Sequence, residues 1–204
     1  NLRESDSGHR FRRVEELLDS LGKIGPESAA LILRDRRGAG GKDIGMCNEL
    51  SINQLLAMHS VIFKPSSREI WVSTYPWQCG EFIRFRLDDI LDSPVPPYHR
   101  DSSKDIPEDI FLHSESFRNL LKFKRSSAGI RSAISSGTEI PEDSISAYIG
   151  LNPLYYNAYN LAGDYFLAKG DEGNACELWK KSLTFEMKLQ ERNLIEKKIE
   201  RYKR

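Results

Sequence analysis

The sequence predicts an α+β fold in which an antiparallel sheet is followed by a mostly helical C-terminal region. Apolar residues recur at helical spacing near the start of the chain and through its second half. Between these helical segments lie three runs rich in β-branched and aromatic residues, which favour strands. A stretch rich in proline follows the third run. We therefore expect an α/β part over 1–92, a linker over 93–108 and a helical region over 109–204.

Composition and charge exclude several classes of protein. The chain has 204 residues, and its 30 Lys and Arg balance its 30 Asp and Glu, so it lacks the excess positive charge of nucleic-acid binders. No apolar run approaches the ~18 residues of a membrane span. The three cysteines show no CxxC spacing, which argues against a disulfide framework and a zinc site. We expect a soluble protein without metal, cofactor, nucleic-acid partner or membrane span, and the unpaired cysteines favour a reducing, cytoplasmic compartment.

Two helices are predicted before the sheet. The first covers about 8–21, with Ser7 as its N-cap and Gly22 as its stop. The second begins at Pro26, a residue suited to a first helical turn, and ends near Asp35, before a glycine-rich loop. The amphipathic spacing of the first helix is carried by Phe11, Val14, Leu17, Leu18 and Leu21.

Three consecutive antiparallel strands are predicted over 58–63, 69–75 and 81–87. The first two are joined by 64–68, a loop of hairpin length with Pro65 in a turn position. Apolar residues alternate with arginine along the third strand, so its two faces differ. Three strands cannot cover both faces of their own sheet, and a second sheet or helices must pack on them.

The C-terminal region is predicted to be helical. We expect Asn152 to cap one of its helices, with Pro153 at the first helical position. The predicted helices cover about 110–124, 127–136, 141–149, 153–168, 172–187 and 189–203.

One spacing in this region matches the tetratricopeptide pattern of large, small and aromatic positions. It runs from Tyr159 through the small pair Ala162-Gly163 to Phe166, and then through Ala175 to Trp179. Only one copy is found, whereas stacked repeats need about three to be stable alone. The single copy favours a helical hairpin packed against its own domain over a peptide-binding array.

No familiar catalytic motif is present: there is no nucleophile elbow, P-loop, HExxH or paired-glycine fingerprint. Cys47 is a candidate nucleophile or pocket thiol, and the alternative is a small buried hydrophobe. Arg12 could steer a carboxylate or amide substrate, or form surface ion pairs. His59 could form the wall of an active site, or be structural. Trp77 could line a hydrophobic acyl pocket, or pack a corner between strands.

Five segments occur in an order that resembles a known family. The order resembles the C-terminal half of the autoproteolytic acyltransferase/amidohydrolase family typified by acyl-coenzyme A:6-aminopenicillanic-acid acyltransferase. Two further segments, Asn152–Tyr156 and Leu161–Phe166, are similar to bacterial members. The five segments are Arg10–Leu18, Leu33–Asp35, Ala57–Pro65, Ile70–Ser73 and Gly80–Phe82.

The resemblance implies an N-terminal-nucleophile fold, in which two antiparallel sheets lie between layers of helices. A precursor cleaves itself before a cysteine, and the freed thiol attacks a linear amide with its own α-amine as base. Asn1 cannot serve as that nucleophile, and the chain lacks an initiator methionine, so we expect a processed or excised piece.

The expected function is therefore that of the C-terminal portion of a Cys-dependent amidohydrolase or acyltransferase. Its partners would be the upstream part of the same precursor, which carries the nucleophile, and a small acylated amide substrate. No catalytic residue is expected in this chain itself. The alternative is a non-catalytic, helical-repeat-like protein-interaction module.

Overall fold

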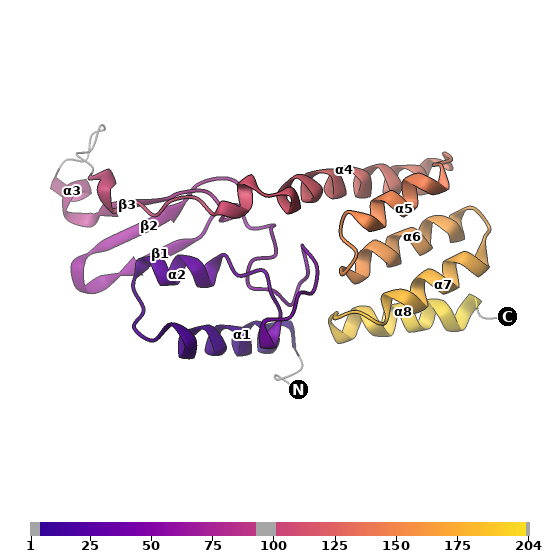
Figure 1. Ribbon diagram of the computed structural model, residues 1–204, viewed down its shortest axis with the longest axis horizontal. Helices are drawn as coiled ribbons and strands as arrows, with labels where there is room; N and C mark the ends of the chain where they lie inside the picture. The colour runs from indigo at the N-terminus through magenta and orange to yellow at the C-terminus, as the bar shows by residue number, and fades with distance from the viewer. Residues whose placement is uncertain (1–4, 93–100, 203–204) are drawn as a thin grey trace.

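The computed structural model describes residues 5–92 and 101–202 and shows an α+β fold, mostly helical, with one small antiparallel sheet (Figure 1). The proline-rich stretch 93–98, at the start of the predicted linker, lies outside the described residues. The strands are β1 (Val61–Lys64), β2 (Glu69–Ser73) and β3 (Phe82–Arg86). The α-helices are α1 (Asp6–Leu21), α2 (Pro26–Leu33), α3 (Leu87–Asp92), α4 (Glu115–Ser136), α5 (Glu142–Gly150), α6 (Tyr156–Ala168), α7 (Glu172–Ser182) and α8 (Leu189–Tyr202).

The three predicted strands are confirmed, in the order β1-β2-β3 with antiparallel pairing throughout. The first strand begins at Val61 rather than at Met58. Residues paired directly across an antiparallel sheet point to the same face. One face, called here the covered face, carries Ile62, Trp71 and Phe82, which form a buried cluster with Ala30 of α2. Helix α2 therefore covers this side of the sheet.

The other side of the sheet, called here the open face, is entirely apolar. None of its side chains is buried, and Phe63 is 67% exposed. None belongs to any hydrophobic cluster of the described residues. Solvation of a continuous apolar sheet face is unfavourable. The open face consists of Val61, Phe63, Ile70, Val72, Ile83 and Phe85.

The end of the predicted linker is attached to the sheet. Phe82 and Ile106 exchange backbone hydrogen bonds of 2.9 and 3.0 Å, and Ile106 is buried. The backbone N–H of Arg84 donates to the carboxylate of Asp105 at 2.9 Å. This segment therefore occupies the outer edge of β3, while β1 forms the opposite edge of the sheet.

Helix α1 is held by polar contacts. Its N-cap is Ser5 rather than the predicted Ser7, because the Ser5 hydroxyl accepts from the backbone N–H of Gly8. Gly22 ends the helix, as predicted. None of its residues is buried, although the helix is amphipathic. Instead, Arg13 donates to both carboxylate oxygens of Asp35, at 3.1 and 2.9 Å.

Two predictions for the helical region are wrong. A single helix, α4, replaces the two helices predicted over 110–124 and 127–136. No proline or glycine interrupts the sequence between them, and Ser127 is buried where it hydrogen-bonds the hydroxyl of Tyr148. Asn152 is not an N-cap, because α6 begins only at Tyr156 and the Asn152 amide is engaged elsewhere.

Helices α6 and α7 form a close antiparallel hairpin (Figure 1). A Cβ on Gly163 would lie 2.6 Å from the indole of Trp179, so only glycine permits this approach. Trp179 is fully buried and donates to the carboxylate of Asp164 at 3.0 Å. Helix α7 ends at Ser182, earlier than predicted, where the Ser182 hydroxyl donates to the Trp179 carbonyl.

The irregular loop 43–55 joins the α/β part to the helices. The amide of Asn152 exchanges two hydrogen bonds with the Met46 backbone, at 3.0 and 2.8 Å. Asn48, which is fully buried, donates to the carbonyls of Ile44 and Glu186. The loop therefore fixes the position of the α5–α6 and α7–α8 turns relative to the sheet.

Neighbouring residues of β1 allow a direct test of the two faces. Ile62→Ala removes a buried side chain from the covered face and is expected to lower the free energy of unfolding by about 2–4 kcal/mol. Phe63→Ala removes a side chain that is 67% exposed and is expected to change it by about 0.5 kcal/mol or less. Urea unfolding followed by tryptophan fluorescence measures both. Equal losses would show that the open face is packed in this chain.

Candidate functional site

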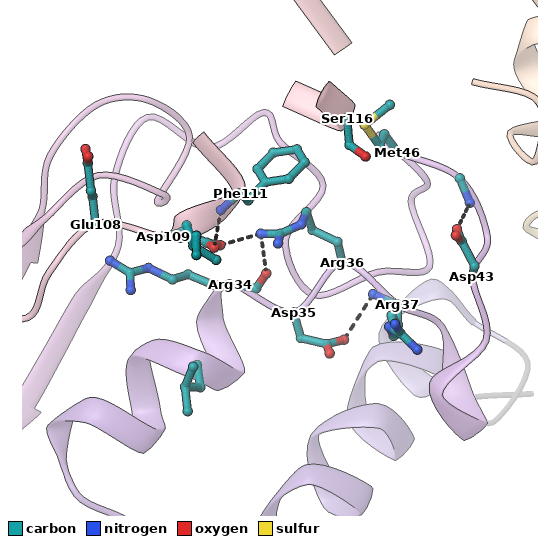
Figure 2. A pocket seen from close by; sticks show the side chains of 13 residues that line it. Arg34, Asp35, Arg36, Arg37, Asp43, Met46, Glu108, Asp109, Phe111 and Ser116 are labelled. Carbon is teal, nitrogen blue, oxygen red and sulfur yellow. Dashed lines mark hydrogen bonds and ion pairs between the residues drawn. The ribbon is translucent and has the colours of Figure 1, made fainter. Parts of the chain in front are cut away.

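A pocket of about 570 Å³ lies between the end of α2 and the start of α4 (Figure 2). One wall of the pocket comes from the loop after α2, and the other comes from the turn Ile110–His113 that precedes α4. Both charged and apolar side chains reach it. The lining residues are Leu31, Arg34, Asp35, Arg36, Arg37, Asp43, Gly45, Met46, Glu108, Asp109, Ile110, Phe111 and Ser116.

Arg34 is the buried anchor of this pocket, with 8% of its surface exposed. Its guanidinium donates to three backbone carbonyls, those of Gln78 at 3.4 Å, Gly80 at 2.8 Å and Pro107 at 2.8 Å. It also lies 5.0 Å from the centre of the Phe82 ring. All these partners are neutral, and burial lowers the pKa of Arg34.

Arg36 lies beside Arg34 and is fixed along one side only. Its Nη1 donates to the Asp109 carboxylate at 2.5 Å and to the Arg34 carbonyl at 3.0 Å, and it lies 3.9 Å from the sulfur of Cys79. The guanidinium carbon lies 4.0 Å from the centre of the Phe111 ring. Its Nε and Nη2 make no hydrogen bond with the described residues. Figure 2 shows Arg36 near the middle of the pocket.

The other lining acids are engaged by neighbours. Asp35 accepts a bidentate pair from Arg13, and this hydrogen bond raises the pKa of Arg13. Glu108 is hydrogen-bonded to the ring of His113 at 2.8 Å. Asp109 pairs with Arg36 at 2.5 Å, and the charges of Asp109 and Glu108 both act on Arg34.

The residues proposed from sequence do not line a common pocket. Arg12 is exposed on α1, where it bonds the ring of His9 at 3.1 Å, and it lines a second pocket of about 190 Å³. His59 is exposed, two residues before β1. Trp77 is half-buried, with the Lys124 ammonium 4.1 Å from its ring centre.

All three cysteines are free thiols, with Cys47 half-buried and the other two buried. Cys47 packs between two hydrophobic clusters, and burial raises its pKa to about 11. Cys79 is fully buried, and burial likewise raises its pKa. Cys176 is buried beneath the end of α8. A thiol is a nucleophile only as its thiolate, so the raised pKa lowers the reactivity of both Cys47 and Cys79 at neutral pH.

The arginine pocket was not predicted from sequence. Its only local signal is the run Arg34-Asp35-Arg36-Arg37 directly after the apolar helix α2. In the described part of the chain no three His, Cys, Asp or Glu side chains are arranged to hold a metal ion. Nor does any helix of residues 5–92 and 101–202 have the length and apolarity needed to cross a membrane.

Comparisons of the chain with protein-family models, with curated proteins and with solved structures give no match.

Burial of Cys47 predicts slow alkylation. Its pKa of about 11, against an ordinary value of 9.0, leaves about one hundredth of the usual thiolate at neutral pH. Iodoacetamide labelling of the native chain, located by peptide mass mapping, is expected to be slow at pH 7.5 and to rise with pH toward 11. Labelling in urea is the control and should be fast. Equal native and unfolded rates at pH 7.5 would contradict this account.

Arg34 is expected to stabilise the fold rather than to bind a ligand directly. Arg34→Met leaves three carbonyls without their donor and should lower the free energy of unfolding by about 2–4 kcal/mol. The matched control is Arg37→Met. Because Arg37 is exposed, this substitution should lower the free energy of unfolding by about 0.5 kcal/mol or less. Urea unfolding measures both. Similar losses in the two variants would refute the anchoring role.

Proposed function

We propose that this chain is the C-terminal portion of a Cys-dependent N-terminal-nucleophile amidohydrolase or acyltransferase that acts on linear amide bonds. Its nucleophile is carried by another stretch of polypeptide. The observation that carries the proposal is the open face of the sheet. In a layered sandwich the outer face of each sheet is covered by helices, and the inner faces meet about 10 Å apart. Helix α2 and the open face match the outer and inner sides of such a sheet.

The surface of α1 supports the same proposal. The helix is amphipathic, yet none of its residues is buried, and Phe11 is 62% exposed. An apolar stripe on a helix normally packs against a core. A further layer of polypeptide would cover both this stripe and the open face.

The segments that carry the family resemblance are also those that hold the α/β part together. Arg13, in the first segment, pairs with Asp35, in the second. Arg34, in the second, donates to the carbonyl of Gly80, in the fifth. Such residues build the scaffold of an active site rather than its reacting groups, which agrees with a nucleophile located elsewhere.

The burial of Cys47 and Cys79 agrees with this assignment. Cys47 and Cys79 have raised pKa values because they are buried, and Cys176 lies in the helical region. Neither Cys47 nor Cys79 therefore has the lowered pKa of an activated thiolate. A Cys-dependent reaction in this protein would thus need a thiol from outside the chain.

A helical-repeat-like interaction module is the second candidate, and the α6–α7 hairpin favours it. Gly163 and Trp179 occupy the small and aromatic positions of a tetratricopeptide-like unit. The hairpin is nevertheless packed against its own domain, with Ile195 of α8 buried and Lys198 donating to Asp164 at 2.6 Å. This packing favours a structural role for the hairpin over peptide binding.

The proposal predicts that the open face is needed for assembly with the nucleophile-bearing part. Ile83→Glu, made in the full-length precursor, is expected to abolish the appearance of a chain that begins with cysteine and the hydrolysis of N-acyl amino acids. Intact-mass measurement and a turnover assay give the two readouts. A charged residue buried between two sheets is strongly destabilising, which is the physical reason.

Arg86→Glu is the matched control, because Arg86 is exposed and lies on the same strand but on the covered side. The isolated chain should show no hydrolysis, and its Ile83→Glu form should keep the helical circular dichroism of the wild type. Normal processing and turnover of the Ile83→Glu precursor would refute the proposal.

A further inference from the structure

Helix α1 lies at the border of the α/β part (Figure 1) and adds no buried residue to its core. None of its side chains belongs to a hydrophobic cluster of the described residues. Phe11 and Leu18, on its apolar side, are 62% and 39% exposed. A helix normally unfolds together with its domain because its apolar face is buried in the core. For α1 this coupling is weak.

Hydrogen bonds of charged side chains hold α1 in place instead. Arg13 donates to both carboxylate oxygens of Asp35, at 3.1 and 2.9 Å, and each of these two side chains is 12% exposed. The Glu16 carboxylate accepts from the backbone N–H of Gly40 at 2.8 and 2.9 Å and from Arg13 at 3.1 Å, and these bonds lower its pKa. Arg13 is therefore the central contact of the helix.

The same helix forms one wall of the small pocket of about 190 Å³. His9 and Arg12 supply this wall, and the other lining residues belong to the loop after α2 or, in the case of Glu186, to the segment between α7 and α8. Arg10 donates to the carbonyl of Glu49 at 2.7 Å, farther along that loop. The pocket loses its wall of His9 and Arg12 when α1 moves away.

We propose that α1 is a lid that opens as one unit while the sheet and the helical region stay folded, with Arg13 as its latch. Opening exposes the glycine-rich loop and the small pocket to solvent. Its cost is the loss of charge-assisted hydrogen bonds rather than of core packing. The lid goes beyond the proposed amidohydrolase function and does not rest on it, because all these contacts belong to this chain.

Amide hydrogen exchange, followed residue by residue by NMR and corrected for intrinsic rates, tests the lid in the whole chain. Amides 10–21 are expected to share one rate, at least about tenfold faster than that of the β2 amides. Arg13→Gln removes the latch and should speed exchange across 10–21 by about tenfold or more, with β2 unchanged. Arg12→Gln, at the exposed neighbouring position, is the matched control and should stay within about twofold of the wild type.

A double variant tests whether Arg13 acts through Asp35. Arg13→Gln combined with Asp35→Asn should exchange within about threefold of Arg13→Gln alone, because the second change removes a partner that is already lost. Multiplication of the two single effects would refute this latch. The lid itself is overturned if amides 10–21 exchange as slowly as those of β2, if Arg13→Gln and Arg12→Gln behave alike, or if Arg13→Gln speeds β2 equally. A gradient of rates from residue 10 to residue 21 would also overturn it, since it would show fraying from the N-terminus.

Discussion

The structure depends on how the backbone of the loop 43–55 is satisfied in the interior. The loop has no regular secondary structure, and buried backbone groups must still find hydrogen-bond partners. Asparagine side chains supply them. Asn53, 1% exposed, accepts from the N–H of Leu55 and donates to the Trp77 carbonyl, and Asn48 and Asn152 act similarly at the contacts with the helices. Asn48 and Asn53 each satisfy backbone groups on two segments, and Asn152 satisfies both backbone groups of Met46, so buried amides connect the loop with the strand turn at Trp77 and with the helical region.

The same loop explains the geometry of the arginine pocket. It follows the run Arg34–Arg37 after the short turn Ala39–Gly41, and Asn53 donates toward the sulfur of Cys79, which in turn lies beside Arg36. The Nη1 side of Arg36 is consequently fixed from the protein interior, and its Nε side is left toward the pocket.

The strands could be predicted from sequence because β-branched and aromatic residues are concentrated in all three runs and alternation at period two is clear in the third. The alternation along β3 was confirmed, with Ile83 and Phe85 on one face and Phe82 and Arg84 on the other. The arginine pocket could not be predicted, because Arg36 and Asp109 are 73 residues apart and no local pattern pairs them. The prediction that Asn152 caps a helix was wrong for a related reason. Its amide hydrogen-bonds the backbone of Met46, 106 residues away, and this long-range contact replaces the local N-cap that the sequence predicted.

The backbone at Cys47 bears on why that cysteine is present. Its φ is 67°, in the left-handed region that side chains other than glycine, asparagine and aspartate rarely adopt. Gly45, two residues earlier, lies so near the Tyr155 backbone that a Cβ there would come within 2.5 Å of it. A sharp turn is thus imposed on this segment by its contact with the helices, and position 47 requires a small apolar side chain that fits between two clusters. The turn and the packing of Cys47 between the two clusters therefore result from the same contact between this loop and the helical region.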